Sequence, residues 1–170
     1  MILLTWLNIA LTLKCSLDTE IERKKTWLAL HHLTFEIICP ANIMIVAIYW
    51  SLIHPERMKD PYFSENSHIL FAVSINHSSP LTFNLINFYL TDVIIAAKHW
   101  KPLLPIGIVY LGVNYVETMK SGEPLYPFLT WEPTMTTVAT VIGLILFPLG
   151  NHLLLAWITR SIKRGSSRVK

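Results

Sequence analysis

The chain has 170 residues, of which 52% are hydrophobic and 15% are charged, and its formal net charge is +3. Its mean hydropathy is +0.45, well away from the balance of a soluble globular domain of this length. The composition indicates an integral membrane protein in contact with the lipid bilayer, and we expect no nucleic-acid partner. The predicted fold class is all-α, a polytopic bundle of transmembrane helices with about five spans.

Five apolar blocks follow one another along the chain. Their ranges are 2–15, 33–53, 69–95, 103–116 and 134–158. A helix needs about 20 residues, within a range of about 17–25, to cross a bilayer, so the second, third and fifth blocks are long enough by themselves. The fourth block can be extended by Trp100 on one side and by residues 117–119 on the other.

The first block begins at the start of the chain and admits several explanations. It is a span cut short at its outer end, a re-entrant piece, or the product of a truncated gene model. A cleavable signal peptide is the weaker alternative, because no basic residue precedes the apolar run and Lys14-Cys15-Ser16 is a poor cleavage site.

Lysine and arginine predict the orientation, because short cytoplasmic loops carry an excess of both. With five spans, only Arg57, Lys59 and Lys120 of the 14 basic residues fall on one side. The C-terminus is therefore predicted to be cytoplasmic and the first residue to lie outside. We expect a single transmembrane helical domain over residues 1–159, a basic cytoplasmic tail over 160–170 that touches anionic lipid headgroups, and a location in the endoplasmic reticulum or plasma membrane.

The third block carries a periodic set of polar residues and one proline. His77, Pro80, Asn84, Asn87 and Thr91 recur at steps of three and four, which places them on one side of a helix. That side should face other helices, because polar groups that face lipid go unpaired, and the proline is predicted to kink the helix. These residues either form a polar pocket around the imidazole or join helices by hydrogen bonds, and periodicity alone favours the second.

Two further polar positions lie in other blocks. Glu36 is near the inner end of its block, where it can reach the headgroup layer, and His152 follows Asn151 in the last block as a second candidate for a functional imidazole. No zinc pattern, phosphate-binding loop or dinucleotide fingerprint appears in the sequence. We therefore expect neither a cofactor nor a metal site.

Short motifs occur in order along most of the chain. They are residues 4–11 (LTWLNIAL), 46–50 (VAIYW), 76–79 (NHSS) continuing into 81–86 (LTFNLI), and 126–129 (YPFL). They resemble successive signatures of the androgen-induced-gene-one and androgen-dependent TFPI-regulating protein family. The resemblance implies a multi-span membrane enzyme, an atypical threonine hydrolase that cleaves fatty acid esters of hydroxy fatty acids. It also implies that Thr5 is the nucleophile and His77 its partner.

The chemistry that the resemblance implies is sound. A threonine hydroxyl reacts only with a base in hydrogen-bond reach, about 2.6–3.2 Å, and histidine is the side chain whose unperturbed pKa suits a base near neutrality. His77 takes the proton from Thr5 as its oxygen attacks the ester carbonyl, and water later releases the acyl group. An orienting group and an oxyanion donor are also needed. The candidates for both roles are Asn8, Asn76, Asn84 and Asn151.

Depth and length leave other interpretations open. In a five-span arrangement with Met1 at the surface, Thr5 and His77 differ in depth by about 12 Å, too far for proton transfer. The family is expected to carry one more span upstream and a longer loop after the threonine motif, so the resemblance implies an N-terminally truncated or inactive relative. The alternatives are a non-catalytic membrane protein closer to the rolling-stone relatives, with Thr5 and His77 apart, and a small transporter that uses Asn and His as relay groups.

Overall fold

The computed structural model describes residues 2–17, 21–91 and 93–166. Within these ranges every regular element is helical and no strand occurs. The elements are α1 (Ile2–Leu17), α2 (Ile21–Ile48), the π-helical turn η1 (Tyr49–Ile53), α3 (His54–Lys59), α4 (Pro61–Glu65), α5 (Ser67–Leu90), the 3₁₀ turn η2 (Ala97–Trp100), α6 (Leu103–Ser121) and α7 (Met135–Ser166). The all-α fold class is confirmed.

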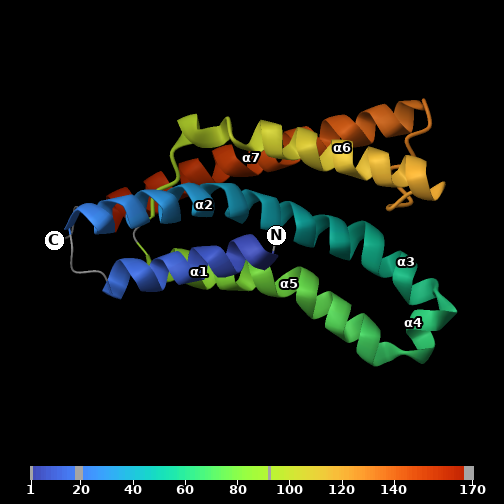
Figure 1. Ribbon diagram of the computed structural model, residues 1–170, viewed down its shortest axis with the longest axis horizontal. Helices are drawn as coiled ribbons and strands as arrows, with labels where there is room; N and C mark the ends of the chain where they lie inside the picture. The colour runs from blue at the N-terminus through green and yellow to red at the C-terminus, as the bar shows by residue number, and fades with distance from the viewer. Residues whose placement is uncertain (1, 18–20, 92, 167–170) are drawn as a thin grey trace.

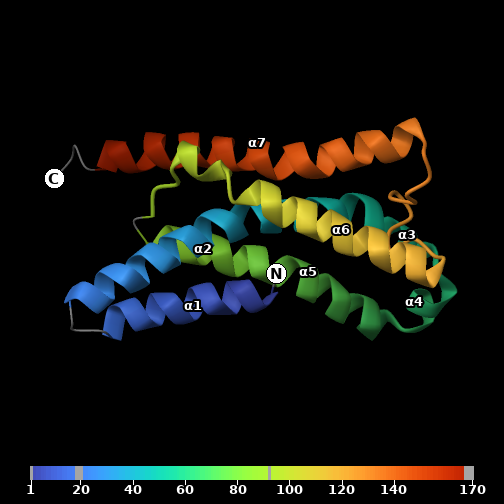
Figure 2. The ribbon, with the colours of Figure 1, turned by 45° about the horizontal axis from the view of Figure 1, so that its top comes forward.

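Helix α2 runs through the middle of the bundle. Helices α1 and α5 lie along one side of it, and α7 lies along the other with α6 packed against α7 (Figures 1 and 2). The short helices α3 and α4 turn the chain from α2 into α5 (Figure 1). Helices α1 and α5 therefore run in the same direction, and α2 runs opposite to both.

Local sequence explains where several of these helices change or end. Pro55 lacks an N–H and its ring crowds the carbonyl of the preceding turn, and the backbone there widens into η1, where the His54 N–H bonds the Tyr49 carbonyl. Asp60 caps α4 by accepting a hydrogen bond of 2.9 Å from the Tyr62 N–H. Helix α6 stops at Gly122, whose φ of 72° suits a residue without a Cβ.

The third apolar block does not end where the sequence predicts. We expect it to run to residue 95, whereas α5 ends at Leu90 and Thr91 is already extended. The apolar run continues as an extended segment in which Ile95 is fully buried against Phe35 and its neighbours. A buried extended segment has the same hydropathy as the end of a helix, so composition alone cannot separate the two.

Three helices are long and apolar enough to cross a membrane. They cover Lys24–Lys59, Ser67–Leu90 and Met135–Ile162, and they correspond to the three blocks that the sequence marks as long enough. Helix α1, with 16 residues, and α6, with 19, are not among them. The transmembrane character is thus supported for three helices.

The polarity of the bundle is the reverse of that of a soluble protein. Large apolar side chains such as Phe71 and Tyr89 are 67% and 88% exposed, whereas Asn84 and His152 are at most 2% exposed. This distribution suits helices surrounded by lipid, where polar groups must find partners inside the protein. The predicted inward face of α5 is confirmed at Pro80, Asn84 and Asn87, which are all buried.

The packing of α2 yields a stability prediction. Phe35 is fully buried, stacked on Phe88, and Phe71 is 67% exposed. We expect Phe35→Ala to lower the free energy of unfolding by about 3 kcal/mol, because it leaves a cavity, and Phe71→Ala to change it by no more than about 0.5 kcal/mol. Thermal unfolding of both variants in detergent measures the difference, and equal shifts would contradict this assignment of the core.

Candidate functional site

Helices α1, α2 and α5 are joined by a buried polar cluster around Asn8. The side-chain amide of Asn8 donates to the His31 carbonyl at 3.0 Å and to the Thr34 hydroxyl at 2.8 Å. Its carbonyl oxygen accepts from Nδ2 of Asn87 at 2.7 Å. Because both N–H groups of Asn8 are engaged, this residue acts as an interhelical link, and it offers no spare donor for an oxyanion.

Thr5 belongs to a second polar layer one helical turn away. It is 3% exposed, and its hydroxyl oxygen accepts a hydrogen bond of 3.2 Å from Nδ2 of Asn42. Thr5 comes three residues before Asn8 on α1, and Asn84 comes three residues before Asn87 on α5. Because Asn8 and Asn87 are paired and the two helices are parallel, the helical repeat places Thr5 and Asn84 on the same facing sides, one turn earlier. Nδ2 of Asn84 is buried and has no hydrogen-bond partner among the described residues.

His77 lies nearer the start of α5, against η1. Its Nδ1 is 2.8 Å from the Val73 carbonyl, and since a carbonyl only accepts, Nδ1 carries the hydrogen and neutral His77 has its lone pair on Nε2. The ring stacks on Tyr49 with a centroid distance of 4.2 Å. The tautomer is therefore the one in which Nε2 can take a proton.

Thr5 contacts α2, whereas His77 contacts η1, the turn that directly follows α2. Their partners Asn42 and Tyr49 are seven residues apart, which is roughly 10 Å along a helix. The contact points of Thr5 and His77 are thus about two helical turns apart.

The remaining amide candidates lie elsewhere. Asn76 is exposed. Asn151 is on α7, across α2 from α1 (Figure 1), and its buried Nδ2 has no hydrogen-bond partner in the described part of the chain. Of the four predicted amides, Asn84 is the one that the helical repeat brings beside Thr5 with its nitrogen available.

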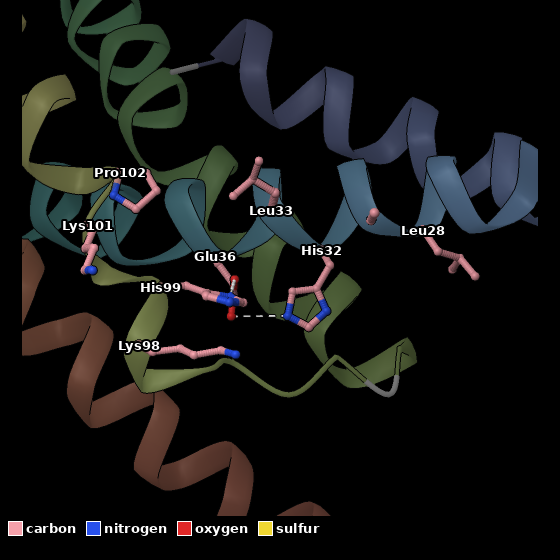
Figure 3. A pocket seen from close by; sticks show the side chains of 9 residues that line it. Leu28, His32, Leu33, Glu36, Lys98, His99, Lys101 and Pro102 are labelled. Atoms are coloured by element: carbon pink, nitrogen blue, oxygen red, sulfur yellow. Dashed lines mark hydrogen bonds and ion pairs between the residues drawn. The ribbon is translucent and has the colours of Figure 1, made fainter.

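A second polar centre surrounds Glu36 on α2. Glu36 is 1% exposed. Its Oε1 accepts from the Ala96 N–H at 2.6 Å, and its Oε2 is 2.5 Å from Nδ1 of His99. Nε2 of His32, one turn before Glu36, is 3.2 Å from Oε1, and Figure 3 shows the carboxylate between the two rings.

The position of Glu36 corrects the expectation from the sequence. We expect this carboxylate to reach the headgroup layer, but residues 93–99 cover it. The same segment is held to α7 from its other side: Nε2 of His152 is 3.1 Å from the Ala96 carbonyl, and the Ile95 N–H donates to the Thr159 hydroxyl at 3.1 Å. His152, predicted as a candidate imidazole, is fully buried and bonds backbone here.

An open groove of about 650 Å³ lies beside Glu36. Its lining residues are Leu28, Ala29, His32, Leu33, Glu36, Lys98, His99, Lys101 and Pro102. One ligand atom each of His32, Glu36 and His99 lies within 4.8 Å of the others. Sequence reasoning missed this trio, although the spacing of His32 and Glu36 by four residues was a usable signal.

Comparisons of the chain with protein-family models, with curated proteins and with solved structures found no match.

The Asn8 cluster yields a second stability prediction. Asn8→Ala removes hydrogen bonds to α2 and α5 and leaves buried polar groups without partners, so we expect it to lower the free energy of unfolding by about 1–2 kcal/mol. Asn76→Ala is the matched control, because Asn76 is exposed, and its effect should stay within about 0.5 kcal/mol. Unfolding of both variants in detergent gives the comparison, and an Asn8→Ala variant as stable as its control would refute the linking role.

Proposed function

We propose that the chain is a multi-pass membrane hydrolase of fatty acid esters of hydroxy fatty acids, with Thr5 as nucleophile and His77 as base. The observation that carries the proposal is a threonine hydroxyl buried beside side-chain amides, inside a bundle whose outer surface is apolar. A reaction site at this depth suits an ester whose long chains stay within the bilayer. The resemblance of the Thr5 and His77 motifs to a family of threonine hydrolases supports the same activity.

Each polar group near Thr5 has a role in this reaction. The hydrogen bond from Asn42 holds the hydroxyl oxygen in place. As that oxygen attacks the ester carbonyl, Nε2 of His77 takes the proton and later returns it to the leaving hydroxy acid. The buried amide nitrogen of Asn84 serves as a donor to the oxyanion, because its hydrogens have no other partner among the described residues.

The proposal includes an approach of Thr5 to His77 when substrate binds. Their contact points, Asn42 in α2 and Tyr49 in η1, are roughly 10 Å apart without substrate, and proton transfer needs about 2.6–3.2 Å. Catalytic hydrogen bonds are often long in the absence of substrate and tighten only in the complex. The N-terminal halves of α1 and α5, which carry Thr5 and His77, are the parts that must move.

The proposal also includes an arrangement of the helices in the membrane. Helices α1 and α6 complete five spans beside the three long apolar helices. The excess of Lys and Arg at one end supports a cytoplasmic C-terminal tail, with the protein in the endoplasmic reticulum or the plasma membrane. The substrate then enters from lipid.

A second candidate function is that of a non-catalytic membrane protein. The observation that favours it is the use of Asn8 and Asn87 as interhelical links, together with the two turns between Thr5 and His77. On this account the polar residues serve packing alone.

Ester turnover separates the two functions. We expect purified protein in detergent to hydrolyse a fatty acid ester of a hydroxy fatty acid, and Thr5→Ala and His77→Ala each to lower kcat at least about 100-fold, because general-base catalysis contributes about 10²–10⁴-fold. Thr12→Ala on the same helix and His68→Ala at the exposed start of α5 are the matched controls, and they should keep kcat within a few-fold of wild type.

A fluorophosphonate probe provides an independent readout of the nucleophile. Mass spectrometry should find the label on Thr5 in wild type and in His68→Ala, and no label in Thr5→Ala. Absence of both turnover and labelling in folded wild-type protein would reject the hydrolase and leave the non-catalytic function.

A further inference from the structure

We propose that His32, Glu36 and His99 form a binding site for a single divalent transition-metal ion, with Zn²⁺ as the ion that the ligand set suits best. This site is separate from Thr5 and His77, and the inference does not depend on ester hydrolysis. The three residues offer two imidazole nitrogens and one carboxylate, a set that Zn²⁺ commonly takes with a fourth position left open. Imidazole ligands argue against Mg²⁺ and Ca²⁺, which prefer oxygen.

The separations of the donor atoms fit one metal ion. Ligands at about 2.1 Å from a tetrahedral zinc lie about 3.4 Å from one another. In the structure, Nε2 of His32 is 3.2 Å from one carboxylate oxygen of Glu36, and Nδ1 of His99 is 2.5 Å from the other. All three donor atoms lie within 4.8 Å, so small side-chain rotations bring them to coordination distance.

The backbone around Glu36 already holds its carboxylate in place. The Ala96 N–H donates to Oε1 at 2.6 Å, and the Ala96 carbonyl is held in turn by Nε2 of His152. Such outer contacts orient a ligand and add to metal affinity. When a metal binds Nδ1 of His99, the hydrogen of the neutral ring moves to Nε2, and Glu36 Oε2 is freed for the metal.

His32 is the residue that distinguishes a metal site from a purely structural link between Glu36 and the 93–99 segment. Glu36 fastens the 93–99 segment through Ala96 and His99, and that tether is complete without His32. Nε2 of His32 lies 3.2 Å from the same carboxylate as an ion-pair contact, outside hydrogen-bond geometry. A third donor atom aimed at the same point without a hydrogen bond is the arrangement that a metal ion would complete.

The groove beside the trio leaves room for the remaining ligand. His32, Glu36 and His99 line its wall together with Lys98 and Lys101 (Figure 3). The two ammonium groups favour water-derived hydroxide or another anion at the fourth position of the metal.

The test is a Zn²⁺ titration of the full chain, purified without a polyhistidine tag, stripped with a chelator and held in detergent. Competition with a chromophoric chelator should report one equivalent of Zn²⁺ per chain. His32→Ala should lower the affinity at least about 100-fold, since even the loss of an outer contact to a metal ligand costs about 10–100-fold. His68→Ala removes an exposed histidine outside the site and should bind as wild type does.

Thermal unfolding shows whether the loss reflects the site or the fold. In chelator, His32→Ala should unfold at the wild-type temperature, because the tether through Ala96 and His99 remains. Added Zn²⁺ should raise the unfolding temperature of wild type and of His68→Ala, but not that of His32→Ala. Failure of wild type to bind one equivalent, or equal affinity in His32→Ala, His99→Ala and His68→Ala, would overturn the proposal.

Discussion

A polar group inside an apolar bundle must find its partner within the protein, and this constraint decides how the helices of this chain pack. Helix α2 makes most of the hydrogen bonds that satisfy this constraint. Its N-terminal half bonds α1 through the His31 carbonyl and Thr34, and it holds the 93–99 segment through Glu36. Six residues further on from Glu36, Asn42 reaches Thr5. The central position of α2 in Figure 1 follows from these bonds to neighbours on both sides.

At Glu36 the same constraint brings a buried carboxylate together with imidazole side chains. A buried carboxylate is tolerated only when it is paired and hydrogen-bonded, and here a backbone N–H and an imidazole supply the pairing. Residues 93–99 come to lie between α2 and α7 as a result, and the Ile95 side chain of this segment is part of the core. The groove beside Glu36 remains open, and the imidazole of His32 approaches the carboxylate from the side of this groove. The residues that join the helices are thereby placed to bind a ligand as well.

The sequence predicts features that depend on composition and period. Three apolar blocks matched the three long helices, and the polar face of α5 at Asn84 and Asn87 is buried as expected. Features that depend on partners distant in sequence could not be predicted. Glu36 and His99 are 63 residues apart, and nothing in the sequence around either residue predicts that a loop folds over the carboxylate.

In the candidate sites, too, the residue types could be predicted from the sequence, whereas the partners distant in sequence could not. The residue types at Thr5 and His77 were available from the sequence, but their partners Asn42 and Tyr49 follow from helix register, which no local pattern fixes. The end of α5 at Leu90 was missed because an apolar extended segment follows it. Our expectation of no metal site rested on motifs within a single segment, whereas the trio around Glu36 joins two.

The most direct test of this account is a nitroxide scan of α5 in lipid bilayers, in a background without native cysteines. Collision rates with dissolved oxygen, which concentrates in the apolar layer, report which positions face lipid. The account predicts low rates at Asn84 and Asn87 and high rates at Leu85, Ile86 and Tyr89, which are 49%, 50% and 88% exposed. Uniform rates along the helix, or high rates at the two asparagines, would contradict an inward polar face and with it the bundle on which both proposed sites depend.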